Sequence, residues 1–232
     1  MQHREHGHGL GALWWPFTTR RRTISSAPLG GGLGWSHWVL NATVESDYGR
    51  TDPGVHLAEI AADAGEGGTD GVGLMTAVDV TRVQTIHDGF ATLWATVGIG
   101  FPQWAAATLD HDPTTPRVLD EIYRPGTINI VAVLSERLSD AALVNAVATI
   151  AEAKAQAFRD LDIAGTGTIT DAVCIVCPDT EVTQEFGGPR SPAGFWLANA
   201  THRAVIDGAL ADERLTDRIA APGSITNSGV RR

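Results

Sequence analysis

Gly165-Thr166-Gly167-Thr168-Ile169-Thr170-Asp171 follows a long helical pattern and leads directly into an apolar segment, 172–177, that is typical of a strand. We call residues 165–171 the Gly/Thr run. Its small residues let a backbone approach a ligand closely, and Asp171 adds one titratable group. Backbone N–H groups and hydroxyls in such a run can hold a carbonyl or phosphate oxygen. The run therefore predicts a helix–turn–strand unit with a site at the turn, or a turn that is only structural.

Strand and helix patterns continue in both directions from this run. The preceding helix begins after Ser139, a favourable N-cap, and reaches about Phe158. Asp52-Pro53 predicts the start of another helix. The remaining expected elements are strands at 23–26, 38–44, 71–77 and 127–134, a hairpin of 80–86 and 91–97 around Asp88-Gly89, and a final helix at 191–209. We therefore expect an α/β fold, or a mixed α+β one, with a central mixed sheet flanked by helices.

The two halves of the chain resemble each other. Asn41 begins a strand–helix–strand pattern that ends in the glycine-containing segment 71–77, and Asn129 begins another that ends in the Gly/Thr run. The spacings are similar in the two halves. We interpret this as a possible internal duplication of a strand–helix–strand unit, in which Asn41 and Asn129 are equivalent, with chance similarity as the alternative.

Length and charge limit the classes of protein that fit. The chain has 232 residues, 43% of them hydrophobic, and a formal net charge of −10. The acidic charge argues against nucleic acid as a partner, and Arg20-Arg21-Arg22 is better interpreted as a solvated face. No apolar run approaches the roughly 18–20 residues that span a bilayer. We expect a soluble cytoplasmic protein without a membrane partner.

The ends of the chain differ from its middle. Residues 1–20 hold several histidines among glycines and charges, which predicts a flexible His-rich tail. Exposed tryptophan pairs are unusual, so the aromatic patch Trp14–Phe17 is expected to fold back onto the protein. We expect a single domain at 21–210 and a frayed C-terminal tail at 211–232.

Cys174 and Cys177 match the pattern C-x-x-C inside the predicted strand 172–177. Residues three apart on a strand point to opposite faces, so this pair is poorly placed for redox chemistry or zinc binding. We therefore interpret the two cysteines as small buried hydrophobic residues. The sequence predicts no metal site and no cofactor.

The long helix carries a lysine within its apolar stripe. At about 100° per residue, Lys154 aligns with Ile150, whereas Glu152 lies on another side of the helix. Lys154 either extends to water or pairs with a carboxylate, because burying an unpaired ammonium costs several kcal/mol. Asp171, on the following strand, is the expected partner.

Several short motifs occur in order between residues 22 and 208. They are Ser25-Ser26-Ala27-Pro28, Asn41-Ala42-Thr43-Val44, Thr96-Val97-Gly98-Ile99-Gly100, Thr127-Ile128-Asn129-Ile130, Ala142-Leu143-Val144-Asn145-Ala146, Glu152-Ala153-Lys154, the Gly/Thr run and Gly187-Gly188-Pro189. In this order the motifs resemble the adenosylcobinamide amidohydrolase family. The resemblance does not extend to the His-rich start or to the residues after Asp212.

This resemblance implies hydrolysis of the amide that joins aminopropanol to a propionate side chain of the corrin ring, which gives adenosylcobyric acid. The implied partner is a small-molecule corrinoid, and cobalt enters only as part of that substrate. A corrinoid-binding protein without turnover, or a domain whose Gly/Thr run holds another anion, remains the alternative.

The chemistry of amide hydrolysis suggests roles for particular residues. Asp171 is the candidate general base, and Thr168, Thr170 and nearby N–H groups are candidate oxyanion donors. Glu152 could protonate the leaving amine, and Lys154 could hold Asp171. The alternative for Asp171 is a structural carboxylate paired with Lys154, and for Glu152 a solvated helix face.

A corrinoid is broad and flat, so its site should be an open cleft with aromatic or apolar walls. The candidate substrate-binding residues are Asn41, Asn129, Gly165, Gly167, Trp35, Trp38 and Trp104. His37 and His56 are reserve bases, with structural roles as the alternative.

Overall fold

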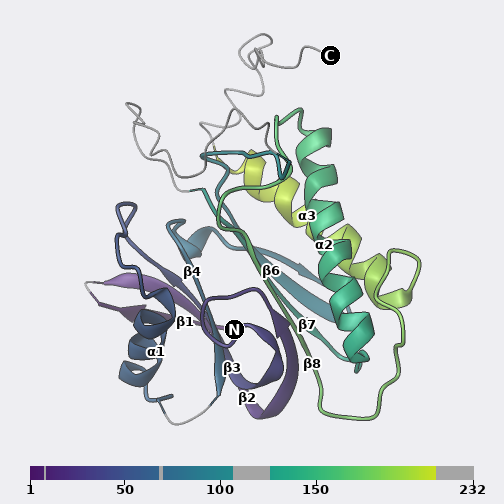
Figure 1. Ribbon diagram of the computed structural model, residues 1–232, viewed down its shortest axis with the longest axis horizontal. Coiled ribbons are helices and arrows are strands. Elements are labelled where there is room, and N and C mark those ends of the chain that lie inside the picture. Colours follow the sequence, from purple (N-terminus) through teal and green to yellow (C-terminus); the bar gives the residue numbers. More distant parts are fainter. Residues whose placement is uncertain (8, 68–69, 107–125, 213–232) are drawn as a thin grey trace.

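The computed structural model describes residues 1–7, 9–67, 70–106 and 126–212. The strands are β1 (Gln2–His6), β2 (Leu10–Ser25), β3 (Gly32–Thr43), β4 (Gly71–Thr76), β5 (Gln84–His87), β6 (Ala91–Val97), β7 (Ile128–Leu134) and β8 (Ala172–Cys177). The helices are α1 (Pro53–Asp63), the 3₁₀ helix η1 (Val80–Arg82), α2 (Asp140–Asp160) and α3 (Pro192–Leu210). Figure 1 shows α1 beside one part of the sheet and α2 and α3 together over the other part. The expected mixed sheet flanked by helices is confirmed.

The sheet has the strand order β4-β3-β2-β8-β7-β6-β5, and β1 pairs with β2 beside this path. β3 and β4 are parallel and joined through α1, and β7 and β8 are parallel and joined through α2. β2 is antiparallel to both β3 and β8. The two strand–helix–strand units therefore run in the same direction and step to the same side of the sheet, as the duplication predicts.

The prediction that Asn41 and Asn129 occupy equivalent positions in these two units is wrong. Asn41 lies near the end of β3, whereas Asn129 lies near the start of β7. Likewise, Gly71–Thr76 forms the whole of β4, whereas the Gly/Thr run precedes β8. Glycine and asparagine patterns are too short to fix a register, so the shared topology does not extend to shared positions.

The sheet curls, so that strands distant in the sheet order come into contact. The Nδ2 atom of Asn129 on β7 donates to the backbone oxygen of Met75 on β4 at 2.9 Å. The residues enclosed by the curled sheet include Leu13, Trp15, Val39, Val72, Leu74, Val131, Cys174 and Val176. On the opposite face, α1 packs over residues of β2 and β3, and α2 and α3 pack over residues of β6, β7 and β8.

Capping residues explain where the long helices begin. The side chain of Ser139 accepts a hydrogen bond from Ala142 N at the start of α2, which confirms the expected N-cap. Ser191 does the same for Gly194 N at the start of α3, where Pro192 occupies the first turn. At α1 the Asp52 side chain makes no cap hydrogen bond. Its carboxylate instead binds Arg50, which lowers the Asp52 pKa.

The expected flexible tail at residues 1–20 is wrong, because these residues form β1 and most of β2. Trp14 and Trp15 are buried, as expected for the aromatic patch. An exposed strand such as β1 needs few apolar residues, because its stability comes from the ladder to its neighbour. Its polar sequence therefore resembled a tail.

The remaining expectations concern the hairpin and the C-terminus. β5 and β6 pair in antiparallel fashion, which confirms the hairpin, but the first strand is shorter than expected because Val80–Arg82 forms the 3₁₀ helix η1. α3 ends at Leu210, and most of the expected C-terminal tail, 213–232, lies outside the described residues. No helix in the described part of the chain is long and apolar enough to cross a membrane.

Candidate active site

Asp171 is the centre of a hydrogen-bonded cluster at the start of β8. Its Oδ1 atom accepts from Ile128 N at 2.9 Å and from the Thr168 hydroxyl. Its Oδ2 atom accepts from Thr168 N at 3.0 Å and from Lys154 Nζ on α2. The Asp171 side chain is 12% exposed and that of Lys154 is 15% exposed. The expected ion pair is therefore present, and the carboxylate has four donors.

The two glycines of the Gly/Thr run allow this close packing. A Cβ atom at Gly167 would lie 2.5 Å from Lys154 Nζ and 2.6 Å from Asp171 Oδ2. The backbone of the run also pairs with Gln103, whose N donates to Gly167 O and whose O accepts from Thr166 N, each at 2.8 Å. Gly165 and Gly167 are buried. They hold the turn in place, and their surfaces face protein rather than a ligand.

The far side of the turn faces solvent. Ile169 and Thr170 are exposed, and Thr168 is half-buried. The hydroxyls of Thr170 and Thr127 share a hydrogen bond at 2.7 Å. Within the described ranges, the backbone N–H groups of Ile169 and Thr170 have no hydrogen-bond acceptor. In the described structure these two donors are therefore available to solvent or to a ligand.

Asn41 and Asn129 meet in the interior, next to this turn in the fold. Asn129 Nδ2 donates to Asn41 Oδ1 at 2.8 Å, and Asn41 Nδ2 donates to Thr96 Oγ1 at 3.1 Å. Both asparagines are buried, with exposed fractions of 2% for Asn41 and 1% for Asn129. They join the two halves of the curled sheet, a contact that leaves them no surface for the peripheral amides of a corrin.

Glu152 does not join the Asp171 cluster. It is exposed on α2, two residues from Lys154 and on another side of the helix. The structure thus brings Asp171, Lys154, Thr168 and Thr170 together and leaves Glu152 in solvent.

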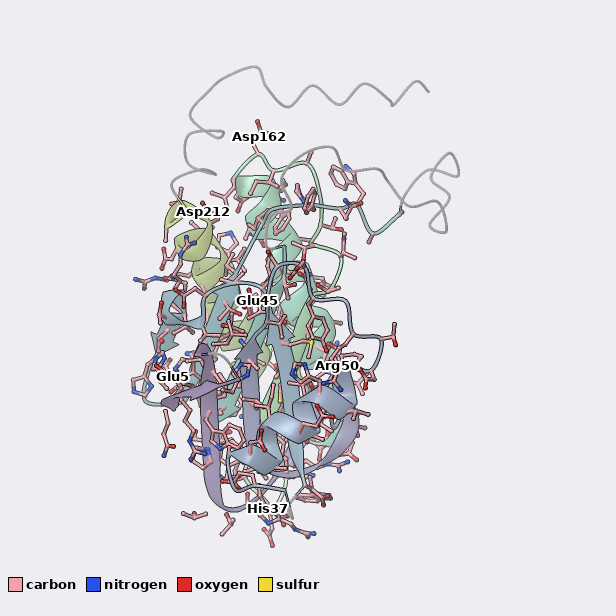
Figure 2. All side chains as sticks on the ribbon, turned by 90° about the vertical axis from the view of Figure 1, so that its left-hand side faces the viewer. Glu5, His37, Glu45, Arg50, Asp162 and Asp212 are labelled. Carbon is pink, nitrogen blue, oxygen red and sulfur yellow. The ribbon has the colours of Figure 1, made fainter. Side chains whose placement is uncertain are left out.

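Trp35 and Trp38 do not join the Asp171 cluster. His37, between them, and Asp162, shortly before the Gly/Thr run, lie at opposite ends of the molecule (Figure 2). The Trp38 ring is buried and stacks on Trp14, with ring centroids 5.2 Å apart. Trp35 and Trp38 do line a cleft of about 360 Å³ together with Gly30, Gly31 and Gly34. This cleft is separate from the Asp171 cluster.

Three arginines surround the Trp35 ring. The guanidinium carbons of Arg20, Arg22 and Arg137 lie 4.5, 5.1 and 5.8 Å from its centroid. Arg22 also donates to both carboxylate oxygens of Asp140, and these hydrogen bonds lower the pKa of Asp140. A corrin would have to displace these guanidinium groups to stack on Trp35. Arg22 is thus part of a packed cluster rather than of a solvated face.

Trp104 is the predicted aromatic residue that lies beside the turn. Its side chain is 51% exposed, and the next residue, Ala105, donates its N–H to Thr166 Oγ1 at 3.0 Å. Sequence reasoning missed the residues that support the turn, Gln103 and Thr127. The sequence did contain a clue to each: Thr127 belongs to the motif at 127–130, and Gln103 follows closely after the motif at 96–100.

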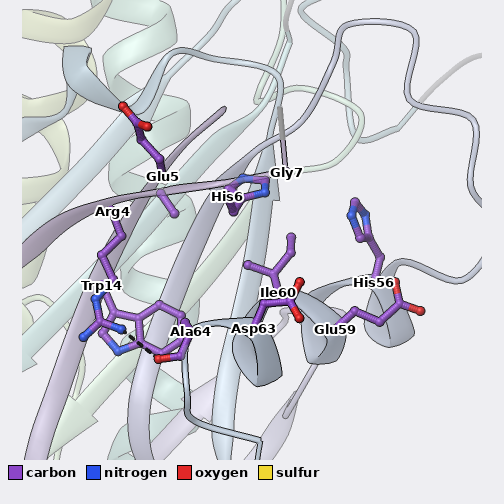
Figure 3. A pocket seen from close by; sticks show the side chains of 11 residues that line it. Arg4, Glu5, His6, Gly7, Trp14, His56, Glu59, Ile60, Asp63 and Ala64 are labelled. Atoms are coloured by element: carbon purple, nitrogen blue, oxygen red, sulfur yellow. Dashed lines mark hydrogen bonds between the residues drawn. The ribbon is translucent and has the colours of Figure 1, made fainter. Parts of the chain in front are cut away.

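Two further cavities lie away from the Asp171 cluster, and of the predicted site residues only the reserve base His56 lines one of them. One of about 190 Å³ lies between β1 and α1, where His6, His56 and Asp63 line it and Arg4 donates to Ala64 O (Figure 3). Burial lowers the pKa of His6 there. The other, of about 700 Å³, lies between α2 and the segment 183–192. It contains the Gly188-Pro189 part of a motif noted in the sequence.

The two cysteines and His56 are held in contacts with the surrounding protein. Cys174 and Cys177 are free and buried, and they pack in different hydrophobic clusters, which confirms their interpretation as core residues. Burial raises the pKa of Cys174 to about 12. His56 is hydrogen-bonded to and stacked on Tyr48. Among the described residues, no group of three or more His, Cys, Asp or Glu side chains is arranged to hold a metal ion.

Known proteins resemble this chain along most of its length. The family model CbiZ, adenosylcobinamide amidohydrolase, matches residues 1–217. An adenosylcobinamide amidohydrolase from Halobacterium salinarum is 33% identical over 171 residues, which are 72% of this chain and 71% of that protein. Another from Methanosarcina mazei is 30% identical over 169 residues, 72% of each chain. The family match includes the His-rich start, which the motif resemblance had left out.

Proposed function

Because the chain belongs to the adenosylcobinamide amidohydrolase family, we propose that it hydrolyses the amide between aminopropanol and a propionate side chain of adenosylcobinamide. The products are adenosylcobyric acid and aminopropanol. The observation that carries this proposal is the Asp171 cluster, in which a carboxylate, an ammonium and a hydroxyl meet beside a solvent-facing turn.

Asp171 is the proton acceptor in this proposal. Lys154 is within ion-pair distance of Asp171 and holds its carboxylate in place beside the turn. The proton that Asp171 receives from the attacking group is then given to the leaving amine. Glu152 is not needed for this step, since its position on the exposed side of α2 separates it from Asp171.

The negative charge on the amide oxygen needs hydrogen-bond donors in the transition state. The backbone N–H groups of Ile169 and Thr170 lie on the exposed side of the turn that holds Asp171, and they supply these donors. The exposed ring of Trp104 provides an apolar wall for the flat corrin beside the same turn. Gly165 and Gly167 support this site by their packing.

The test is an incubation of the purified chain with adenosylcobinamide, analysed by mass spectrometry for adenosylcobyric acid and aminopropanol. Glu152→Gln is the matched control, because it changes a carboxylate that lies outside the cluster on α2, the helix that carries Lys154. Equal amounts of the two products, with the control as active as the wild type, support the proposal. Binding of the corrinoid without product would instead support the non-catalytic alternative.

A further inference from the structure

The carboxylate of Asp171 has no hydrogen-bonding position left for a water molecule. An ionised carboxylate offers about four lone-pair positions. Ile128 N, Thr168 N, the Thr168 hydroxyl and Lys154 Nζ already fill them. A water molecule could be activated by Asp171 only after displacing one of these donors.

Among the four donors, one is a hydroxyl that can act as a nucleophile. Backbone N–H groups cannot attack a carbonyl, and the Lys154 ammonium has no free electron pair while it is protonated. The Thr168 hydroxyl already points its proton at Asp171 Oδ1. A hydroxyl hydrogen-bonded to a base that is itself held by a third group is the arrangement of an activated nucleophile.

We propose that Thr168 Oγ1 is the nucleophile and that the reaction passes through an ester between the corrinoid propionate and Thr168. This inference rests on the proposed amidohydrolase function. Lys154 and Asp171 then act as one unit, in which Lys154 holds Asp171 and Asp171 accepts the Thr168 proton.

The packing around Thr168 supports this assignment. Gly167, on one side, is buried and has no room for a side chain beside the Lys154–Asp171 pair. Ile169, on the other side, is 70% exposed, so the half-buried Thr168 stands where the cluster meets solvent. A carbonyl that approaches from solvent would meet the hydroxyl and the N–H groups of the turn.

The two half-reactions balance in atoms and protons. In the first, Thr168 Oγ1 bonds to the amide carbon, its proton moves to Asp171, and the C–N bond breaks as aminopropanol leaves with that proton. In the second, the esterified Thr168 no longer donates to Asp171 Oδ1, so a water molecule takes that position, bonds to the ester carbon and gives a proton to Asp171. The ester C–O bond then breaks, and Thr168 Oγ1 takes the proton back. The net reaction consumes one water and forms one acid and one amine.

Thr170 is a less suitable nucleophile. Its hydroxyl shares a hydrogen bond with Thr127 Oγ1 and with no carboxylate in the described structure. The cluster therefore distinguishes two threonines that the sequence pattern treats alike.

The test compares Thr168→Val and Thr168→Ser with wild type, using Thr183→Val as the matched control. Thr183 is another threonine whose hydroxyl bonds a carboxylate, that of Glu136, outside the site. We expect Thr168→Val to lose about 10³-fold or more in kcat and Thr168→Ser to stay within about tenfold. Thr183→Val should match wild type, and melting temperatures will show whether each variant folds.

Hydroxylamine provides the direct readout, because it captures an ester as a hydroxamate. Wild type turning over adenosylcobinamide should form the corrinoid hydroxamate, and acid-quenched enzyme should carry the corrinoid acyl group on the peptide with Thr168. If wild type hydrolyses adenosylcobinamide but forms neither hydroxamate nor adduct, the assignment of Thr168 as the nucleophile is overturned, even if Thr168→Val is inactive. The proposed function would still stand. No hydrolysis by wild type would instead overturn the proposed function itself.

Discussion

Replacing Asp171 with alanine is expected to destabilise the fold more than replacing Lys154 with methionine, although the two side chains form one ion pair. Asp171→Ala removes the acceptor of four donors. An unpaired buried donor costs about 1–3 kcal/mol, and solvent reaches part of this half-buried turn, so we expect a loss of about 4 kcal/mol. Lys154→Met leaves three of the four donors on Asp171 and keeps the apolar stem, so we expect about 1–2 kcal/mol.

Urea denaturation at pH 7, followed by circular dichroism, measures both losses in free energy of unfolding. The double variant completes a cycle that isolates the coupling between the two side chains. Glu152→Gln is the control on the same helix, and it should change the free energy by less than about 0.5 kcal/mol. Equal losses for Asp171→Ala and Lys154→Met, or a larger loss for Lys154→Met, would refute the view that Asp171 organises the turn.

Three further outcomes are expected. Arg22 lowers the pKa of Asp140, so Asp140→Asn should reduce stability at pH 6–7, above the ordinary carboxyl pKa of about 4. Denaturation curves should show this difference vanish as the pH falls through the lowered pKa, and an equal loss at every pH would contradict the role of the Arg22–Asp140 pair. Gly71→Ala places a methyl group against the buried Trp38 ring, so urea denaturation should show a loss of about 3 kcal/mol, and an unchanged midpoint would show that the contact is loose. Deleting residues 1–12 removes β1 and the start of β2, so the melting temperature should fall by roughly 5 °C or more, whereas an unchanged value would restore the interpretation as a tail.

The sequence was sufficient where a pattern depends on local chemistry. Ser139 and Ser191 as helix starts follow from side-chain capping, and the opposite faces of Cys174 and Cys177 follow from the alternation of a strand. The pairing of Lys154 with Asp171 followed from the cost of an unpaired buried charge.

The sequence was insufficient where the curl of the sheet determines which residues meet. That curl brings Asn41 and Asn129 together in the interior, which no spacing along the chain predicts. Trp35 lies on the same strand as Asn41 but about 20 Å away along β3, at 3.3 Å per residue. Residues grouped as one site by their chemistry are therefore divided between two regions of the fold.

If amide hydrolysis occurs at the Asp171 cluster, the substitution Asp171→Asn removes the proton acceptor of the reaction, and its kcat reports that loss. Asparagine keeps the shape of the side chain but cannot accept the proton, so kcat for adenosylcobinamide should fall by about a hundredfold or more. Corrinoid binding, measured by equilibrium dialysis on the folded variant, should persist. Near-normal turnover by folded Asp171→Asn would contradict the account and leave Asp171 as a structural anchor of the turn.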